Sequence, residues 1–288
     1  MKRIVTVQDI SCVGKCSLTV ALPVISACGV ETAVIPTAVL SAHTAFPQFT
    51  FRDLTDEIAP IMESWKAQNV GFDAIYTGYL GSERQIALME RFFEEFRPKD
   101  GLIFVDPVMA DNGRMYTGFA PDFADSMARL CAKADIIIPN LSEACFMLHR
   151  PFLSGGYSED DIRTVLQELT RLGAKTAVLT GVSFEPGKIG VAAYDSRTKE
   201  YFTYFTEKIP QSFHGTGDVF SSACLGALMC GLTLQNALKT AANFTVAAIK
   251  DTVKNPGHNW YGVDFETALP TLLKELEANE SEVVSRES

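Results

Sequence analysis

The sequence predicts an α/β fold in which a mostly parallel central sheet carries helices on both faces. Short apolar runs rich in β-branched residues alternate with longer amphipathic segments along most of the chain. Such alternation is typical of parallel sheets joined by crossover helices. The chain has 288 residues, of which 47% are hydrophobic and 21% charged, so it can also build one large core.

The predicted strands are short and mostly apolar, as buried parallel strands are. They cover residues 4–7, 32–36, 74–77, 102–105, 136–138 and 176–179. Two further runs, 189–194 and 200–206, flank five residues of turn-forming character and predict an antiparallel hairpin at the edge of the sheet.

The predicted helices lie between and after these strands, at residues 18–28, 82–96, 158–173, 218–230, 234–251 and 265–279. The helix at 158 begins with Ser158 and three acidic residues, which is typical of a capped N-terminus. We expect a single domain over 1–278 and a loose polar tail over 279–288.

Charge and composition argue against several classes of protein. The net charge is −10 and the basic residues are scattered, which disfavours a nucleic-acid partner. No apolar stretch has the length of a membrane span, and the first residues lack a secretory signal, so we expect a cytoplasmic protein without membrane contact. The seven cysteines form no metal-binding pattern and are expected to be reduced thiols.

Polar residues follow most of the predicted strands. They include Asp9 and Ser11, His43 and Thr44, Thr77 and Tyr79, Asp106, Asn140 and Glu143, and Thr180. Ligands of parallel sheets bind beyond the carboxyl ends of the strands. A row of polar residues at this edge therefore predicts the rim of an active site.

The run Gly215-Thr216-Gly217-Asp218 opens a predicted helix. Glycines at a helix start let backbone N–H groups approach an anion, and the helix dipole favours negative charge there. A carboxylate in the first turn could then remove a proton from an alcohol beside a phosphate. The alternative is that Asp218 only caps the helix. The other acidic strand ends make the catalytic interpretation the stronger one.

Asp106, Asn140 and Glu143 supply oxygen atoms of the kind that Mg²⁺ prefers. Helix capping by Asn140 and Glu143 is the alternative, and it is compatible with the first. Gly14-Lys15-Cys16-Ser17 lacks the upstream glycine of a P-loop, and no dinucleotide-binding fingerprint follows the first strand, which disfavours an oxidoreductase.

Several motifs in order resemble the pyridoxal kinases of the ribokinase-like superfamily over nearly the whole chain. They are Ser41-Ala42-His43-Thr44, Thr77-Gly78-Tyr79-Leu80-Gly81, Asp106-Pro107-Val108-Met109, Pro139-Asn140-Leu141-Ser142-Glu143 and Gly215-Thr216-Gly217-Asp218. The resemblance implies a three-layer ribokinase-like sandwich, usually dimeric. It also implies transfer of the ATP γ-phosphate to the 5′-hydroxymethyl group of a B6 vitamer, with Mg²⁺ and with a monovalent cation left open.

The resemblance also assigns roles to residues. Asp218 is the implied base, and Gly215, Thr216 and Gly217 form the implied anion hole. The implied nucleotide and metal residues are Asp106, Asn140, Glu143, Thr180, Lys208 and Ile209. The implied substrate residues are Ser11, His43, Thr44, Tyr79 and His214, with a hydroxyl such as Ser11 facing the ring nitrogen. Residues 109–119 are expected to cover the site.

Two departures from the family pattern leave alternatives open. The loop after Ser11 is short, and His214 resembles the hydroxymethylpyrimidine kinases, which commonly have Cys where this chain has Asp218. A hydroxymethylpyrimidine kinase is therefore the second interpretation. A non-catalytic carrier or sensor of B6 phosphates is the third, although a binding protein would not need Asp218 together with the Mg²⁺-type carboxylates.

Overall fold

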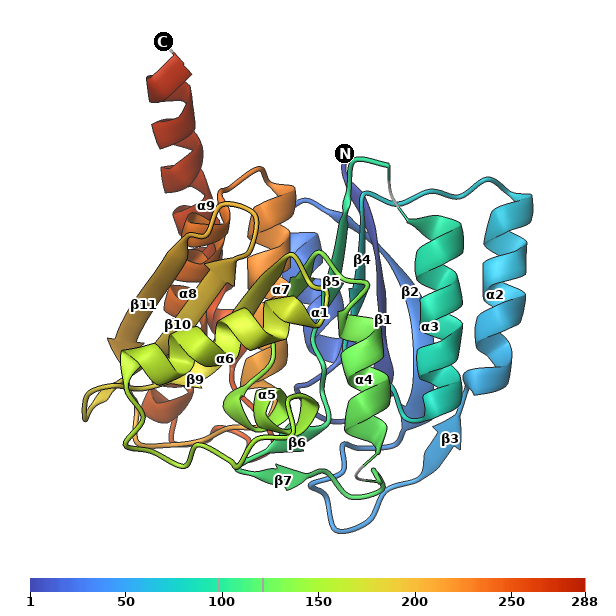
Figure 1. Cartoon of the computed structure of the whole chain (residues 1–288), viewed down its shortest axis with the longest axis horizontal. Helices are drawn as coiled ribbons and strands as arrows, with labels where there is room; N and C mark the ends of the chain where they lie inside the picture. Colours follow the sequence, from blue (N-terminus) through green and yellow to red (C-terminus); the bar gives the residue numbers. More distant parts are fainter. Residues whose placement is uncertain (98, 121, 288) are drawn as a thin grey trace.

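The computed structural model describes residues 1–97, 99–120 and 122–287, with side chains described as far as Asn279. A 9-stranded sheet runs through the middle of the molecule (Figure 1). Its strands lie in the order β11 (Tyr201–Glu207), β10 (Lys188–Asp195), β9 (Thr176–Val182), β8 (Ile136–Ile137), β5 (Leu102–Val105), β4 (Ala74–Thr77), β1 (Arg3–Ser11), β2 (Glu31–Leu40) and β3 (Phe51–Asp53).

The strands from β9 to β2 in this order are parallel to their neighbours, and β1 pairs with both β2 and β4. Strands β10 and β11 form an antiparallel hairpin at one edge, which confirms the predicted edge hairpin. The short strand β3, which was not predicted, adds an antiparallel strand at the opposite edge.

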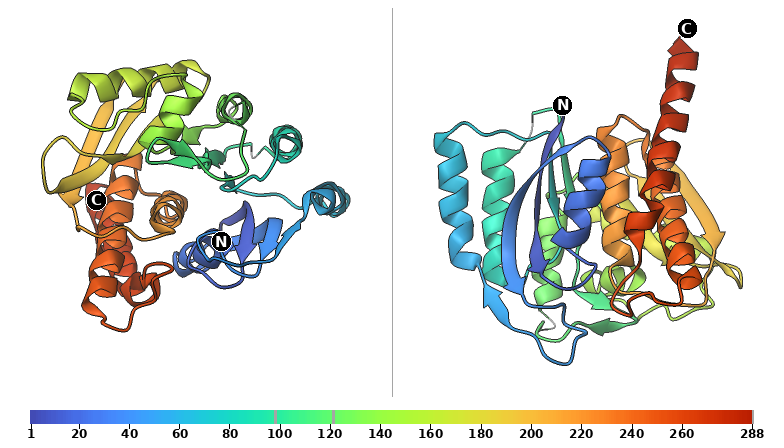
Figure 2. Two further views of the ribbon diagram at one scale, coloured as in Figure 1. Left: turned by 90° about the horizontal axis from the view of Figure 1, so that it is seen from below. Right: turned by 180° about the vertical axis from the view of Figure 1, so that it is seen from behind.

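Helices cover both faces and make the predicted three layers. On one face lie α2 (Thr55–Ala67), α3 (Glu83–Phe96), α4 (Phe123–Cys131), α5 (Leu141–Met147) and α6 (Glu159–Arg171). On the other lie α1 (Leu18–Ala27), α7 (Thr216–Met229), α8 (Leu234–Lys254) and α9 (Phe265–Glu287), as the view from behind in Figure 2 shows. Each face buries its own apolar cluster against the sheet.

Helices α2, α4 and α9 differ from the prediction, and α5 was predicted only as a helix start at Asn140. Helix α2 contains Pro60, a residue type that usually breaks a helix. The helix forms nevertheless, because Ile58 and Met62 are buried against the sheet. Helix α4 was also missed. The predicted end of the last helix at residue 279 is wrong, because α9 continues to Glu287 and its last turns extend past the other elements (Figure 1).

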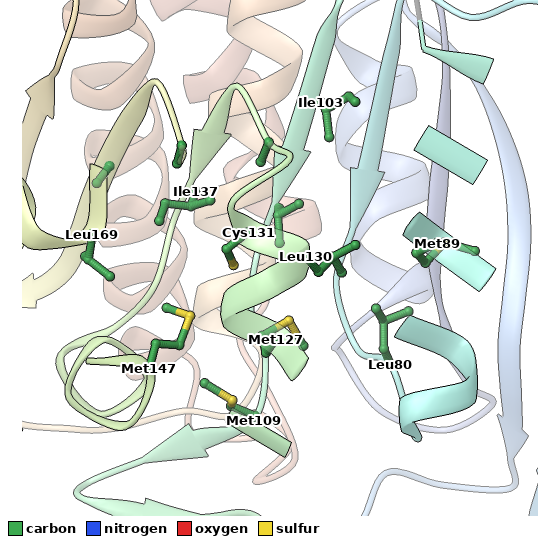
Figure 3. Close-up of a cluster of buried hydrophobic side chains, with 14 of the residues drawn as sticks. Leu80, Met89, Ile103, Met109, Met127, Leu130, Cys131, Ile137, Met147 and Leu169 are labelled. Atoms are coloured by element: carbon green, nitrogen blue, oxygen red, sulfur yellow. The ribbon is translucent and has the colours of Figure 1, made fainter. Parts of the chain in front are cut away.

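A buried cluster on the α3–α6 face holds the start of the segment predicted to cover the site. Figure 3 shows Met109 beside Met127 of α4 and Met147 of α5, and all three side chains are buried. Met109 leads into a small antiparallel ribbon, β6 (Ala110–Asp111) and β7 (Arg114–Met115). The segment 109–119, called the cover segment below, is therefore rooted in the core at its first residue.

Within the part of the chain that the structure describes, no helix combines the length and the apolar character of a membrane span.

Candidate active site

The carboxyl ends of the parallel strands meet at the lower end of the sheet in Figure 1, where β6 and β7 also lie. The loop after β1 packs there against the start of α7. A Cβ atom at Gly215 would lie 1.8 Å from the carbonyl oxygen of Lys15, and Gly215 has a φ of 80°. Only glycine meets both conditions without strain. Lys15 Nζ in turn lies 2.8 Å from Asp264 and 2.9 Å from Glu266, which fixes this loop to the start of α9.

Asp218 lies in the first turn of α7, partly buried. Burial raises the pKa of its carboxyl group to about 7, the backbone N–H of Ser17 opposes this rise, and the charge of Asp9 adds to it. A carboxyl group that titrates near neutral pH is suited to act as a general base. The helix N-terminus beside it offers backbone N–H groups to an anion.

Asp9 is a second carboxylate at this edge, which the sequence interpretation gave no role. The Ser11 hydroxyl donates to its Oδ2 over 3.0 Å, and both residues are buried. Burial raises the pKa of Asp9, while hydrogen bonds from the Ser17 and Ser11 hydroxyls lower it. Residues two apart in a strand share a face, so the pattern Asp9-Ile10-Ser11 could have shown that the two side chains meet.

Aromatic side chains line the same side of the site. His43 Nδ1 accepts a hydrogen bond from the Ala45 N–H (3.2 Å), so Nε2 carries the proton and donates it to the Tyr261 carbonyl (3.0 Å). The ring of His214 lies 4.3 Å from that of His43 between centroids. Burial, with a smaller effect of His43, lowers the pKa of His214 to about 4. The His214 ring is therefore neutral at pH 7.

The remaining predicted substrate residues are Thr44 and Tyr79. Thr44 follows His43 and is exposed. Tyr79 follows β4, its ring centroid is 5.8 Å from that of Phe119, and burial raises its pKa to about 12. Their contacts with a substrate stay predictions.

Asp106 and Glu143 are two further acidic residues of the site, and each is linked electrostatically to its neighbour. The Ser221 hydroxyl donates to Asp106 Oδ2 over 2.7 Å, and burial together with the charge of Asp218 raises the pKa of Asp106 to about 7. Glu143 accepts backbone N–H bonds from Met109 (3.1 Å) and Asn140 (2.8 Å). Burial and the charge of Asp106 raise the pKa of Glu143, against these backbone bonds.

Asn140 and Glu143 form a capping box at the start of α5, as the alternative interpretation expected. Asn140 Oδ1 accepts the N–H groups of Ser142 (2.8 Å) and Glu143 (3.0 Å). Its Nδ2 donates to the Ala110 carbonyl of the cover segment over 2.8 Å. The Gly113 N–H donates to the Ser142 hydroxyl over 2.8 Å. This helix start thus holds the cover segment in place.

Asp106 offers a magnesium ion its Oδ1, for which the described residues show no hydrogen bond. Among the described residues, no group of three or more His, Cys, Asp or Glu side chains is arranged to hold a metal ion. Ser221 occupies only Oδ2 of Asp106, whereas both oxygens of Glu143 accept backbone N–H bonds. Mg²⁺ usually binds one or two carboxylates and completes its shell with waters and phosphates. Asp106 fits that demand directly, and Glu143 fits it only through water.

Three predicted nucleotide residues belong to the β9–β11 part of the sheet. Thr180 pairs with Asn140 in an isolated parallel bridge, which joins it to the Glu143 side of the site. Lys208 and Ile209 follow β11; Lys208 is exposed and its N–H donates to the Gly187 carbonyl over 2.8 Å. The roles of these three residues toward ATP stay predictions.

Comparison with known proteins gives a consistent result. The family described as phosphomethylpyrimidine kinase matches residues 20–263. The pyridoxine kinase of Bacillus subtilis (strain 168) is 30% identical over 187 residues, which cover 64% of this chain and 66% of that protein, slightly under two thirds.

Solved structures resemble the whole chain. A protein from Bacteroides thetaiotaomicron VPI-5482, provisionally described as a phosphomethylpyrimidine kinase, is 40% identical with a TM-score of 0.91, covering 94% of this chain and 93% of that one. An orthorhombic form of it was crystallised with pyridoxal. The pyridoxal kinase of Lactobacillus plantarum is 28% identical with a TM-score of 0.87, covering 95% and 97%. Together with the family match, these relatives confirm the predicted superfamily, and the chain belongs to the phosphomethylpyrimidine kinase family.

Proposed function

We propose that this chain transfers the γ-phosphate of ATP to the 5′-hydroxymethyl group of a B6 vitamer, namely pyridoxal, pyridoxamine or pyridoxine. The observation that carries the proposal is the pairing of Asp218, whose pKa is about 7, with the N-terminus of α7 directly beside it. Pyridoxal and pyridoxine kinases among the relatives support this substrate class.

In the proposed reaction Asp218 accepts the proton of the substrate hydroxyl as its oxygen attacks the γ-phosphorus. The N–H groups from Gly215 to Gly217 donate to the phosphoryl oxygens, where charge develops. Magnesium, when bound near Asp106, would neutralise phosphate charge. The cover segment, held by Asn140 and Ser142, would exclude water that could otherwise accept the phosphoryl group.

The test is a kinase assay with purified protein, Mg-ATP and each of the three vitamers. Formation of the 5′-phosphate, detected by chromatography, is the expected result. A folded sample that phosphorylates none of them would overturn the proposal, and tight vitamer binding without turnover would favour the non-catalytic carrier.

A hydroxymethylpyrimidine kinase is the second candidate, because the family pattern of His214 points to it and the matched family is described as phosphomethylpyrimidine kinase. Side-by-side kcat/KM values for hydroxymethylpyrimidine and pyridoxine decide between the two. We expect the vitamer to be preferred, since the base is Asp218 rather than Cys.

We further propose that the protein acts as a homodimer in the cytoplasm, as the family resemblance implies. Light scattering after gel filtration would measure the mass of the assembly. Activity in K⁺ compared with Na⁺ would decide whether a monovalent cation takes part.

A further inference from the structure

The loop after β1, residues 12–17, ends in a strained backbone conformation. Ser17 has a φ of 49°, in the left-handed region that favours glycine. A residue other than glycine keeps such a conformation only where the surrounding structure holds it there. In this conformation the Ser17 N–H donates a hydrogen bond to the Asp218 carboxylate. The position of the proposed base therefore depends on what holds this loop.

Lys15 holds the loop from the side of α9. Its Nζ lies 2.8 Å from Asp264 Oδ1 and 2.9 Å from Glu266 Oε2, and only 15% of its side chain is exposed. The stem of Lys15 packs on Gly262, where an added Cβ would lie 2.5 Å from the Lys15 Cβ. Lys15 and Asp264 are both largely shielded from water, so salt screens their ion pair less than an exposed one.

Asp264 is itself fixed to the end of α8. Its N–H donates to the Thr252 hydroxyl over 2.7 Å, and its Oδ2 accepts a hydrogen bond from Asn255 Nδ2 over 3.1 Å. Thr252 lies in α8 and is buried. The partner of Lys15 is therefore part of the junction between α8 and α9, which gives the loop after β1 a fixed point of attachment.

The main chain of Lys15 also contacts the proposed anion hole. A Cβ atom at Gly215 would lie 1.8 Å from the Lys15 carbonyl oxygen, so the hydrogen that glycine has in this place points at that oxygen. Two residues later, the Ser17 N–H is bonded to Asp218. The same short loop thus contacts the first residue of the anion hole and the base, and a shift of the loop would change both contacts.

We propose that Lys15 is a positioning residue of the transfer reaction and acts through its ion pair with Asp264. The pair holds the loop so that the Lys15 carbonyl stays against Gly215 and the Ser17 N–H stays on Asp218. This inference rests on the proposed function and adds a positioning residue to it. The ammonium group is directed to α9, so Lys15 acts through the anion hole and the base rather than on a substrate.

The test measures kcat and KM with pyridoxine and Mg-ATP for Lys15→Met, in which an unbranched side chain carries no charge. The groups that the loop positions act on the transition state. We therefore expect kcat to fall about 10- to 100-fold, while the KM values of both substrates stay within about twofold. Lys15→Arg keeps a charge that pairs with carboxylates, so it should restore most of the kcat.

Asp264→Asn tests the ion pair from the other partner. A double variant that combines it with Lys15→Met should lose about as much kcat as the more severe single variant, because both changes remove the same pair. The double variant also removes the carboxylate that Lys15→Met leaves unpaired, so it serves as the folded sample if that single variant unfolds. Thermal melting of each variant verifies that the rates are measured on folded protein.

Lys133→Met is the matched control. Lys133 lies 2.8 Å from Glu94 in an ion pair between α3 and the end of α4, outside the candidate site. This variant removes a lysine from an ion pair of the same length, and it should keep the kcat of the unmodified protein. A loss of kcat in Lys133→Met equal to that in Lys15→Met would show that the effect does not come from the loop after β1.

Two kinetic results would overturn the proposal. One is an unchanged kcat in folded Lys15→Met. The other is a rise in the KM for pyridoxine alone, which would place Lys15 in substrate binding.

Hydrogen exchange separates this inference from the proposed function. The Ser17 amide should exchange faster in Lys15→Met and regain its protection in Lys15→Arg, as measured by mass spectrometry of the peptide that contains it. If the unmodified protein phosphorylates no vitamer, this difference in exchange still supports the role of Lys15 in holding the loop. Equal exchange in the unmodified protein and in Lys15→Met refutes it.

Discussion

Asp218 and Glu143 are acidic residues that are each linked electrostatically to Asp106, and their surroundings differ in the number of hydrogen bonds they receive. Glu143 accepts backbone N–H bonds on both oxygens, from Met109 and from Asn140. Asp218 receives a backbone N–H from Ser17, with burial raising its pKa to about 7. The Glu143 carboxylate therefore holds two segments together, whereas the Asp218 carboxylate can still accept a proton.

This difference separates structural from chemical acids in a site where burial raises the pKa of all of them. Asp106 stands between the two, with one oxygen bonded to Ser221. Residue type predicted that all three belong to the site, together with a position after a strand for Asp106 and Glu143 and at a helix start for Asp218. Their division of labour follows from the backbone donors, which only the folded chain defines.

Asp218→Asn should produce the largest effect on activity. The substitution keeps shape but removes the base, so kcat should fall about 10²- to 10⁴-fold while vitamer binding persists. Steady-state kinetics and equilibrium binding measure the two quantities. An unchanged kcat would reduce Asp218 to a helix cap.

The Asp218→Asn variant should have a higher melting temperature than the unmodified protein at pH 8. The pKa of Asp218 is raised from 3.8 to about 7 in the folded state. A carboxyl group whose pKa is raised in the folded state favours folding most below its unfolded pKa of 3.8. This contribution is lost as the pH rises through the folded pKa of about 7. Asn carries no charge, so its melting temperature should exceed that of the unmodified protein at pH 8 and lose this advantage near pH 4.

Gly215→Ala tests the packing that brings the β1 loop to the anion hole. The added Cβ would lie 1.8 Å from the Lys15 carbonyl at a φ of 80°, so the loop or the helix start must move. We expect a loss of about 2–4 kcal/mol in the free energy of unfolding, from backbone strain and overpacking. Denaturant unfolding measures it.

Gly217→Ala is the matched control for Gly215→Ala. No heavy atom lies within 4 Å of a Cβ built at Gly217, so this variant should unfold at nearly the same denaturant concentration as the unmodified protein. Equal stability losses at the two positions would show that the close approach of the β1 loop does not constrain the site.

The central sheet could be predicted from the sequence because its strands are short apolar runs with helices between them. Strands β4 and β5 begin and end at the predicted residues. Helix α2 could not be predicted, since Pro60 interrupts its pattern and its stability comes from packing of Ile58 and Met62. The length of α9 was missed because its polar end resembles a tail.

Only part of the candidate site could be predicted from the sequence, because some contacts depend on the folded chain. Glycines before an acid at a helix start are visible in sequence, and so is the capping pattern of Asn140 and Glu143. Asp9 was given no role, although its spacing from Ser11 could have shown their contact; its hydrogen bond with Ser17 depends on the folded loop after β1.

Glu143→Gln should affect stability more than chemistry. The amide can accept one backbone N–H, but its NH₂ group faces the other donor, which leaves that buried N–H unsatisfied. We expect the free energy of unfolding to fall by about 1–3 kcal/mol and the KM for ATP to rise. Asp111→Asn, at an exposed position of the cover segment, is the control that should preserve stability. A fall in kcat as large as that of Asp218→Asn would mean that Glu143 takes part directly in the chemistry.

The pH dependence of kcat/KM should give the smallest effect, and it distinguishes most sharply between Asp218 and the pair Asp106 and Glu143. Asp218 must be ionised to accept a proton, and its pKa is about 7, so kcat/KM should fall about 10-fold per pH unit below 7 and level off above it. Saturating Mg²⁺ isolates this group, because a cation beside Asp106 would keep that carboxyl ionised. The acid limb should disappear from the residual activity of Asp218→Asn and persist in Glu143→Gln. If it persisted in Asp218→Asn, the titrating group would lie on the Asp106 side, and the assignment of the base to α7 would be wrong.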